Sequence, residues 1–276
     1  MRAKTLGALK CGTCAPRGGQ PGVLDEYNRW TAVVPDPYNL LLPMRTRAVF
    51  FDLYNTLAGY QPSREEVQVL AANKLGVPLT LEGAYRGVSA ADDYWWRQNS
   101  RQRVEERSDA ERQEVYFGWQ RALLEAAGVD ASPHTVARML AASRSLGQSS
   151  LVLYDDVLPT LAVLRGRGLT LAMLSNVDRD IVAFGRELGV ADHLDFMLSS
   201  REVGADKPRA PIFLAALERA GASAEEAIHV GDQYAVDVAG ARNVGIRPLL
   251  LDRHGVKDDV TDVPRIRSLS EIVGYL

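Results

Sequence analysis

The sequence has few cysteines, no long apolar run and no excess of positive charge, and each absence excludes a class of protein. Its only cysteines, Cys11 and Cys14, form one C-x-x-C without a second ligand pair, so we interpret them as exposed thiols rather than a metal or redox site. No apolar stretch approaches the roughly 18 residues needed to cross a bilayer, so we expect no membrane association. The 35 acidic residues outnumber the 32 basic ones, which argues against a nucleic-acid-binding protein.

The N-terminal segment differs in composition from the rest of the chain. Residues 1–43 contain clustered glycine and proline without a sustained apolar period, which predicts a poorly ordered extension. Met44 stands directly before the first apolar strand, and one hypothesis is that the native chain starts there. The apolar stretch at residues 6–9 is too short for a secretory signal, so we expect a cytoplasmic protein.

The remaining chain divides into a helical part and an alternating part. Apolar residues recur at three- and four-residue spacing in residues 64–75, 81–99, 109–127 and 133–146, which predicts four helices. From residue 154 onward, short apolar runs alternate with helical segments, which is typical of a parallel sheet covered on both faces. We therefore expect an α/β protein with a Rossmann-like doubly wound parallel sheet. Its core would be residues 44–60 and 154–276, with a helical bundle, residues 61–153, inserted as a separate domain.

The segment AVFFDLYNTL, residues 48–57, indicates where the chemistry occurs. It predicts a buried strand that delivers Asp52 to its carboxyl end, where open α/β sheets bind their ligands. Tyr54, two residues on, points to the same side of an extended chain and is the natural partner of Asp52. An aspartate in this place can act as a nucleophile, as a metal ligand, or as both.

Other predicted strand ends also carry polar residues, and parallel strands bring these ends to one edge. Carboxylates gathered there would repel one another, and a single lysine balances only one charge. A hard cation resolves this, and Mg²⁺ binds one or two carboxylates with water and a substrate phosphate. Hydroxyls nearby, from Ser175 or Thr56, would bind the remaining phosphate oxygens. We also expect Asn176 and Lys207 to contact the phosphate. The polar residues concerned are Asp52, Ser175, Asn176, Lys207, Asp232 and Asp237.

These segments resemble the motifs of the haloacid dehalogenase superfamily, in the branch with a helical cap inserted after the first motif. FDLYNTL at 51–57, LSN at 174–176, KP at 207–208 and VGD at 230–232 follow the order of its four motifs. The resemblance covers residues 47 to about 252. It implies that Asp52 is the nucleophile and a Mg²⁺ ligand, Ser175 a phosphate donor, Lys207 the charge-balancing base and Asp232 a metal ligand. Asp237 would support Lys207 or the metal.

Tyr54 departs from the phosphatase pattern, which places a second aspartate there as acid and base. A tyrosine titrates near pH 10, so it donates a hydrogen bond but is a poor general base. Metal-independent 2-haloacid dehalogenases of the superfamily do carry tyrosine at this position, but they resemble one another in lacking an acid at the position of Asp232. The metal can survive the change, because in this family that residue contributes its backbone carbonyl.

We therefore expect Mg²⁺-dependent hydrolysis of a small phosphorylated metabolite through an aspartyl-phosphate on Asp52. The alternatives are a metal-independent dehalogenase and a catalytically weak phosphate-binding or regulatory protein. His229 has no partner that the sequence identifies. In the cap, we interpret four aromatic residues as the core and rim of the bundle: Trp95, Trp96, Phe117 and Trp119. Four arginines could reach the site, but we interpret them as solvated surface residues: Arg64, Arg86, Arg97 and Arg101.

Overall fold

The computed structural model describes residues 45–146 and 149–276. The predictions for the N-terminal extension, for Cys11 and Cys14 and for a start at Met44 lie outside these residues. Within them, no helix is long and apolar enough to cross a membrane.

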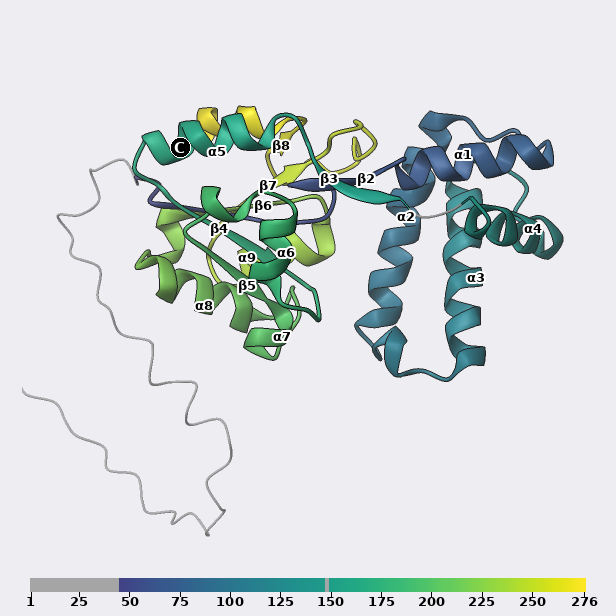
Figure 1. Ribbon diagram of the computed structural model, residues 1–276, viewed down its shortest axis with the longest axis horizontal. Coiled ribbons are helices and arrows are strands. Elements are labelled where there is room, and N and C mark those ends of the chain that lie inside the picture. Colours follow the sequence, from purple (N-terminus) through teal and green to yellow (C-terminus); the bar gives the residue numbers. More distant parts are fainter. Residues whose placement is uncertain (1–44, 147–148) are drawn as a thin grey trace, which may run out of the picture. The chain divides into compact units, whose positions relative to one another are not determined.

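Six strands form one sheet in the order β5-β4-β1-β6-β7-β8, and every pairing in it is parallel (Figure 1). The chain runs outward from β1 through β4 to β5 and then returns to β6 on the other side of β1. Ligands of open α/β sheets bind outside the strand ends at such a reversal. The expected α/β fold of Rossmann type is thus confirmed. The strands are β1 (Ala48–Phe51), β4 (Thr170–Ser175), β5 (Phe196–Ser199), β6 (Ala227–Gly231), β7 (Arg247–Leu251) and β8 (Arg265–Ile266).

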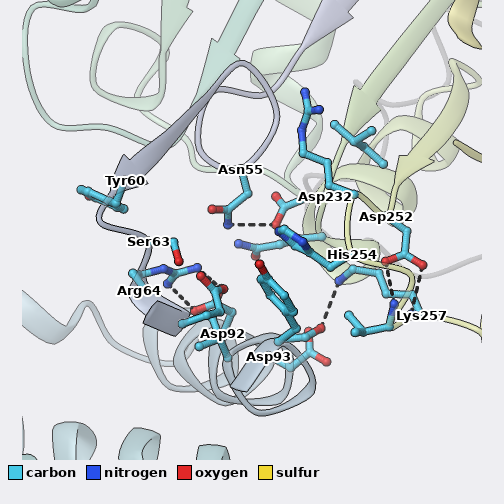
Figure 2. Close-up of a pocket in the computed structure, with 18 of the residues that line it drawn as sticks. Asn55, Tyr60, Ser63, Arg64, Asp92, Asp93, Asp232, Asp252, His254 and Lys257 are labelled. Atoms are coloured by element: carbon cyan, nitrogen blue, oxygen red, sulfur yellow. Dashed lines mark hydrogen bonds and ion pairs between the residues drawn. The ribbon is translucent and has the colours of Figure 1, made fainter. Parts of the chain in front are cut away.

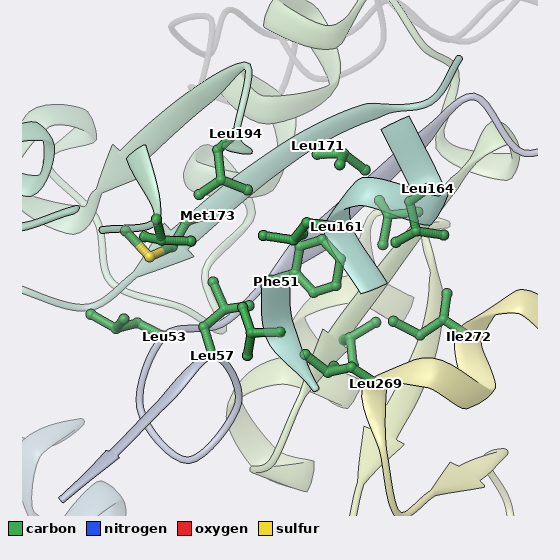
Figure 3. Close-up of a cluster of buried hydrophobic side chains, with 14 of the residues drawn as sticks. Phe51, Leu53, Leu57, Leu161, Leu164, Leu171, Met173, Leu194, Leu269 and Ile272 are labelled. Atoms are coloured by element: carbon green, nitrogen blue, oxygen red, sulfur yellow. The ribbon is translucent and has the colours of Figure 1, made fainter. Parts of the chain in front are cut away.

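Strand β1 is buried on both faces, and its side chains divide between two apolar clusters. Val49 and Phe51 point into one cluster, which Figure 3 shows with side chains from α5 (Val157–Gly166) and from the 3-10 helix η7 (Leu269–Tyr275). Ala48 and Phe50 point into the other cluster, beneath α8 and α9. This alternation follows from the two-residue period of a strand. The remaining core helices are α6 (Ile181–Glu187), α7 (Ser200–Val203), α8 (Ala210–Ala220) and α9 (Ala239–Asn243).

Four α-helices lie between the strands β2 (Ala58–Gln61) and β3 (Ser150–Leu153), where the sequence predicted them. They are α1 (Arg64–Leu75), α2 (Leu81–Asn99), α3 (Asp109–Ala126) and α4 (Pro133–Arg144), and we call them the helical segment. Ser63 and Glu66 form a capping box at the start of α1. The segment has its own apolar cluster, separate from the two clusters around the sheet. The domain boundaries that we set at residues 61 and 153 stay a prediction.

The sequence did not predict the two strands that flank the helical segment. β2 (Ala58–Gln61) and β3 (Ser150–Leu153) pair in antiparallel fashion and form a small second sheet. Each has only four residues, and the glycine and glutamine of β2 give no apolar alternation from which a strand could be recognised. The pair joins the end of β1 to α1 and the end of the helical segment to α5.

Candidate active site

Asp52 lies directly after β1, in the centre of the sheet. The side chain of Phe51 is fully buried, Asp52 is 8% exposed, and the backbone N–H of Asp52 donates to the carbonyl of Val230 on β6 at 2.9 Å. The chain then turns sharply through Asn55, whose φ of 58° lies in the left-handed region that asparagine tolerates. Asp52 and Tyr54 line the same cavity, as expected from their two-residue spacing.

Lys207 joins two of the predicted carboxylates. Its Nζ donates to Oδ1 of Asp52 at 2.6 Å and to Oδ1 of Asp237 at 2.7 Å, and its side chain is only 1% exposed. The sequence led us to expect Lys207 at a strand end balancing one charge. It lies instead on the loop between α7 and α8, and it balances two. Burial alone would lower the pKa of Lys207, but the two carboxylates raise it, so the lysine stays protonated.

Asn176 fixes the backbone of Lys207. Its side-chain amide donates to the Lys207 carbonyl at 2.9 Å, and its Oδ1 accepts from the Lys207 N–H at 2.7 Å. Both ends of the amide are therefore engaged with the protein. A role of Asn176 in binding phosphate stays a prediction, whereas its contact with the Lys207 loop is a feature of the structure.

Asp237 has a second partner that the sequence did not reveal. His229 on β6 is fully buried, and its Nε2 lies 3.0 Å from Asp237 Oδ1. Burial lowers the pKa of His229, so we assign a neutral ring whose Nε2–H donates to the carboxylate. Burial alone would raise the pKa of Asp237, but Lys207 and His229 hold it well below its usual range. Its other oxygen accepts from the N–H of Gln233 at 3.1 Å.

Three carboxylates meet beside these strand ends. One oxygen from each of Asp52, Asp232 and Asp237 lies within 4.8 Å of the others. Asn55 donates to Asp232 Oδ2 at 3.1 Å, while Asp232 Oδ1 is buried without a partner among the described residues. Burial raises the pKa of Asp52 to about 6 and that of Asp232 to about 7. A buried carboxylate oxygen without a donor is the arrangement that a bound cation would complete.

Of the two predicted hydroxyl donors, only one lines the cavity of Asp52. Ser175 is 1% exposed, its Oγ is buried without a partner among the described residues, and it lines the cavity of Asp52. Thr56 also has a buried, unpartnered hydroxyl, but it lies inside the turn after Asp52 and is not among the residues that line this cavity. Of the two, Ser175 is the better placed to contact a ligand.

Tyr54 remains protonated at neutral pH. Burial raises the pKa of its hydroxyl above the ordinary value of 10. Its ring stacks near-parallel to that of Tyr60 on β2, with ring centres 6.1 Å apart. In this setting Tyr54 can donate a hydrogen bond, but it cannot take a proton from water.

Two cavities adjoin Tyr54. The first, which we call the Asp52 cavity, has a volume of about 220 Å³. The second has a volume of about 360 Å³, and we call it the aromatic cavity. The Asp52 cavity is lined by Asp52, Tyr54, Trp95, Trp96, Asn99, Ser175, Asn176, Lys207, Gln233, Val236 and Asp237. The aromatic cavity is lined by Tyr54, Asn55, Tyr60, Arg64, Asp92, Trp95, Tyr116, Trp119 and Gln233.

A third, smaller cavity of about 120 Å³ lies between Asp232 and the helices α1 and α2 (Figure 2). Figure 2 shows Arg64 and Asp92 facing one another across its wall, joined by two hydrogen bonds of 2.8 and 2.6 Å. Arg64 thus lines the site, although we judged a solvated surface position the simpler explanation. Arg86 pairs with Glu82 on the exposed face of α2. The Arg64–Asp92 pair joins residues 28 apart, a spacing that gives no local sequence signal.

Comparison with known proteins identifies the family. The family model described as hydrolase, haloacid dehalogenase-like hydrolase, matches residues 46–245. The haloacid dehalogenase-like hydrolase domain-containing protein 3 of Danio rerio is 33% identical over 133 residues, or 47% of this chain and 55% of that protein. The chain therefore matches only about half the length of that relative. The ribulose-1,5-bisphosphate 5-phosphatase of Halopiger xanaduensis is 32% identical over 211 residues, or 74% of this chain and 84% of that protein.

Among solved structures, the HAD-hydrolase YfnB from Bacillus subtilis, crystallised with magnesium, shares the fold. It has a TM-score of 0.51 and 21% identity, and the match covers 84% of this chain and 99% of that one. The resemblance that the four motifs indicated is confirmed by the family match over residues 46–245 and by the Halopiger relative. The chain belongs to the haloacid dehalogenase-like hydrolase family.

Proposed function

We propose that the protein hydrolyses phosphate monoesters, with Asp52 as the nucleophile and a small phosphorylated metabolite in the cytoplasm as the substrate. The observation that carries this proposal is Asp232, whose Oδ1 is buried without a donor beside Asp52. A carboxylate in that setting is costly unless a cation accompanies it. The phosphatase activity in the name of the Halopiger relative supports the same reaction class.

The donor set fits Mg²⁺, which prefers oxygen ligands and retains water and phosphate among them. Asp52 and Asp232 would hold the ion, and the resemblance adds the backbone carbonyl of Tyr54. Asp237 supports this site from behind, because both of its oxygens already accept hydrogen bonds. When bound, the ion offsets the negative charge of the phosphate and of the two carboxylates.

In the first step, a carboxylate oxygen of Asp52 attacks phosphorus in line. The new oxygen–phosphorus bond forms as the bond from phosphorus to the leaving oxygen breaks, and the electron pair stays on the leaving oxygen. Burial raises the pKa of Asp52 to about 6, but the paired Lys207 opposes the rise and favours the reactive carboxylate at neutral pH. Ser175, with its free hydroxyl in the same cavity, donates to a phosphate oxygen. The role predicted for Thr56, as a second such donor, stays open to test by substitution.

In the second step, water attacks the aspartyl-phosphate. A bond from the water oxygen to phosphorus forms, the bond to Asp52 breaks, and inorganic phosphate leaves while the proton of the water passes to solvent. The usual aspartate base is replaced by Tyr54, whose pKa burial raises further. We therefore expect this step to limit turnover, so that the phosphorylated Asp52 accumulates.

Tyr54 is also the one observation that favours a second function, dehalogenation. A halide leaves without a proton, so a 2-haloacid dehalogenase needs no acid at this position. Asp232 argues against it, because a carboxylate beside the nucleophile would repel an anionic haloacid in a metal-free site. The two functions therefore differ in whether they require Mg²⁺.

The test is turnover of acetyl phosphate and of 2-chloropropionate, each with Mg²⁺ and with a chelator. We expect phosphate release that requires Mg²⁺ and that falls by at least about 10⁴-fold in Asp52→Asn, since loss of a nucleophile has effects of this size or larger. Asp109→Asn, which changes an exposed carboxylate of α3, should leave the rate unchanged. Chloride release that is indifferent to Mg²⁺, without phosphate release, would establish the dehalogenase instead.

A further inference from the structure

The aromatic cavity continues from the Asp52 cavity. The two share Tyr54, Trp95 and Gln233, so a substrate whose phosphate lies beside Asp52 can extend past this shared wall into the aromatic cavity. At about 360 Å³ the aromatic cavity is within the range of roughly 300–1,000 Å³ typical of small-molecule sites. It is the larger of the two, as a site for a leaving group bulkier than phosphate would be.

Aromatic residues make up most of the lining of this cavity, since five of its nine residues are tyrosine or tryptophan. Tyr54 and Tyr60 form one near-parallel pair, with an angle of 16° between the rings. On the helices α2 and α3, Trp95 and Tyr116 form another, with ring centres 5.9 Å apart and an angle of 26°. None of these four side chains is fully buried, so Trp95 belongs to the rim of the bundle, one of the two positions that we expected for it. Such pairs bind a further flat ring by offset stacking.

The charges of the wall disfavour an anionic leaving group. Of the described side chains that line the two cavities, only Arg64 and Lys207 are positively charged. Arg64 makes two hydrogen bonds to Asp92, and Lys207 is paired with Asp52 and Asp237. Arg179 lies beside the Tyr54 hydroxyl but lines neither cavity. Within the lining itself, a second phosphate or carboxylate on the substrate would therefore have to break an existing ion pair in order to find a partner.

We infer that the aromatic cavity binds the leaving group of the substrate and that the substrates are monoesters of phosphate with neutral phenolic or heteroaromatic alcohols. This inference rests on the proposed phosphatase function. In the reaction, the bond from phosphorus to the ring oxygen breaks as the bond to Asp52 forms. The aryl oxide then leaves with the electron pair and is protonated by solvent.

The experiment compares kcat/KM for phenyl phosphate and for acetyl phosphate, an activated phosphate without a ring, in the full chain with Mg²⁺. The ratio of the two values is measured in three variants of neighbouring positions on α3. Tyr116→Leu removes a ring from the cavity, Tyr116→Phe keeps it, and Phe117→Leu removes a ring that packs on the helical cluster and lines neither cavity. We expect Tyr116→Leu to lower the ratio about fivefold, the size of a lost stacking contact, and the other two variants to leave it within twofold.

The outcomes separate this inference from the proposed function. Hydrolysis of acetyl phosphate that requires Asp52, together with a ratio that Tyr116→Leu does not change, would overturn the aromatic leaving group and keep the phosphatase. An equal fall of the ratio in Tyr116→Leu and Phe117→Leu would also overturn it, because both would then act through packing. Failure to hydrolyse either compound would overturn the two together. Faster turnover of ribulose 1,5-bisphosphate than of phenyl phosphate would overturn the inference alone.

Discussion

The charged side chains at the edge of the core sheet are buried, whereas those of the helical segment are partly exposed. At the sheet edge, the side chains of Lys207 and Asp237 are 1% and 3% exposed and lie in one network with Asp52. In the helical segment, the side chains of Arg64 and Asp92 are 31% and 16% exposed and pair only with each other. Both pairs have short, direct contacts, so the difference is in solvation and not in geometry.

This difference shows what each region is built to do. A buried network of charges is seldom the most stable solution, and it is retained where charge must change during a reaction. The half-exposed pair of the helical segment joins α1 to α2 beside the cavities and faces no such demand. Substitutions at the sheet edge should therefore alter activity and stability together, while the same substitutions in the helical segment should have small effects on both.

The largest contrast is expected between Lys207→Met and Arg64→Met. Loss of Lys207 leaves two buried carboxylates without their partner, which should cost about 3–5 kcal/mol of unfolding free energy and at least about 10³-fold in kcat/KM. Loss of Arg64 from a half-exposed pair should cost about 1 kcal/mol or less. Urea unfolding and initial rates with acetyl phosphate measure both effects. If the two variants lose similar stability, then the distinction between the regions is wrong.

The composition of this network was only partly predictable. The order of Asp52, Ser175 and Asp232 along the chain predicted that they meet, because parallel strands bring their carboxyl ends to one edge. Lys207 reaches the same place from the loop between α7 and α8, which the strand pattern did not predict. The contact of His229 with Asp237 was not predicted. It depends on a π-helical turn, η6 (Tyr234–Val238), which rotates Asp237 back toward the strand before it. Such a turn has no apolar period by which it could be recognised.

In the helical segment, the sequence predicted where the helices lie better than which of their side chains line a cavity. The four apolar periods gave all four helices, with ends that differ from the structure by at most two residues. Which faces of α2 and α3 line a cavity depends on how the helices pack. Tyr116 and Phe117 are neighbours in sequence, yet one lines the aromatic cavity and the other packs on the helical cluster. Composition alone could not separate their roles.

Tyr54 connects the two regions, because it lines both the Asp52 cavity and the aromatic cavity. Tyr54→Asp would restore the missing base, and we expect turnover of phenyl phosphate to rise by up to about 100-fold. The wild-type protein should show a burst of phenol release, near one equivalent per active site, before slow steady-state turnover. The variant should show no burst. Rapid-quench measurement tests this, and an unchanged or lower rate in a folded variant that binds Mg²⁺ would contradict it.

The smallest expected difference between the two regions comes from replacing one aspartate by asparagine in each of them. Burial raises the pKa of Asp232 to about 7, above its ordinary value of 3.8, so in Mg²⁺-free protein the folded state loses stability as pH rises from about 4 to 7. Asp232→Asn removes this loss and should stabilise the metal-free protein by about 2 kcal/mol at pH 8, with no gain at pH 4. Asp92→Asn should have the opposite sign at pH 8, because it leaves Arg64 without its carboxylate.

Thermal or urea unfolding at the two pH values measures this pair of variants, first with a chelator and then with Mg²⁺. Added Mg²⁺ should stabilise the wild type and Asp92→Asn but not Asp232→Asn, because binding to the folded state alone raises the free energy of unfolding. Equal destabilisation by both substitutions at pH 8 would mean that Asp232 has a donor in the folded protein after all. In that case the main reason for placing a cation beside Asp52 would be lost. The sheet edge would then differ from the helical segment only in how far its charged side chains are buried.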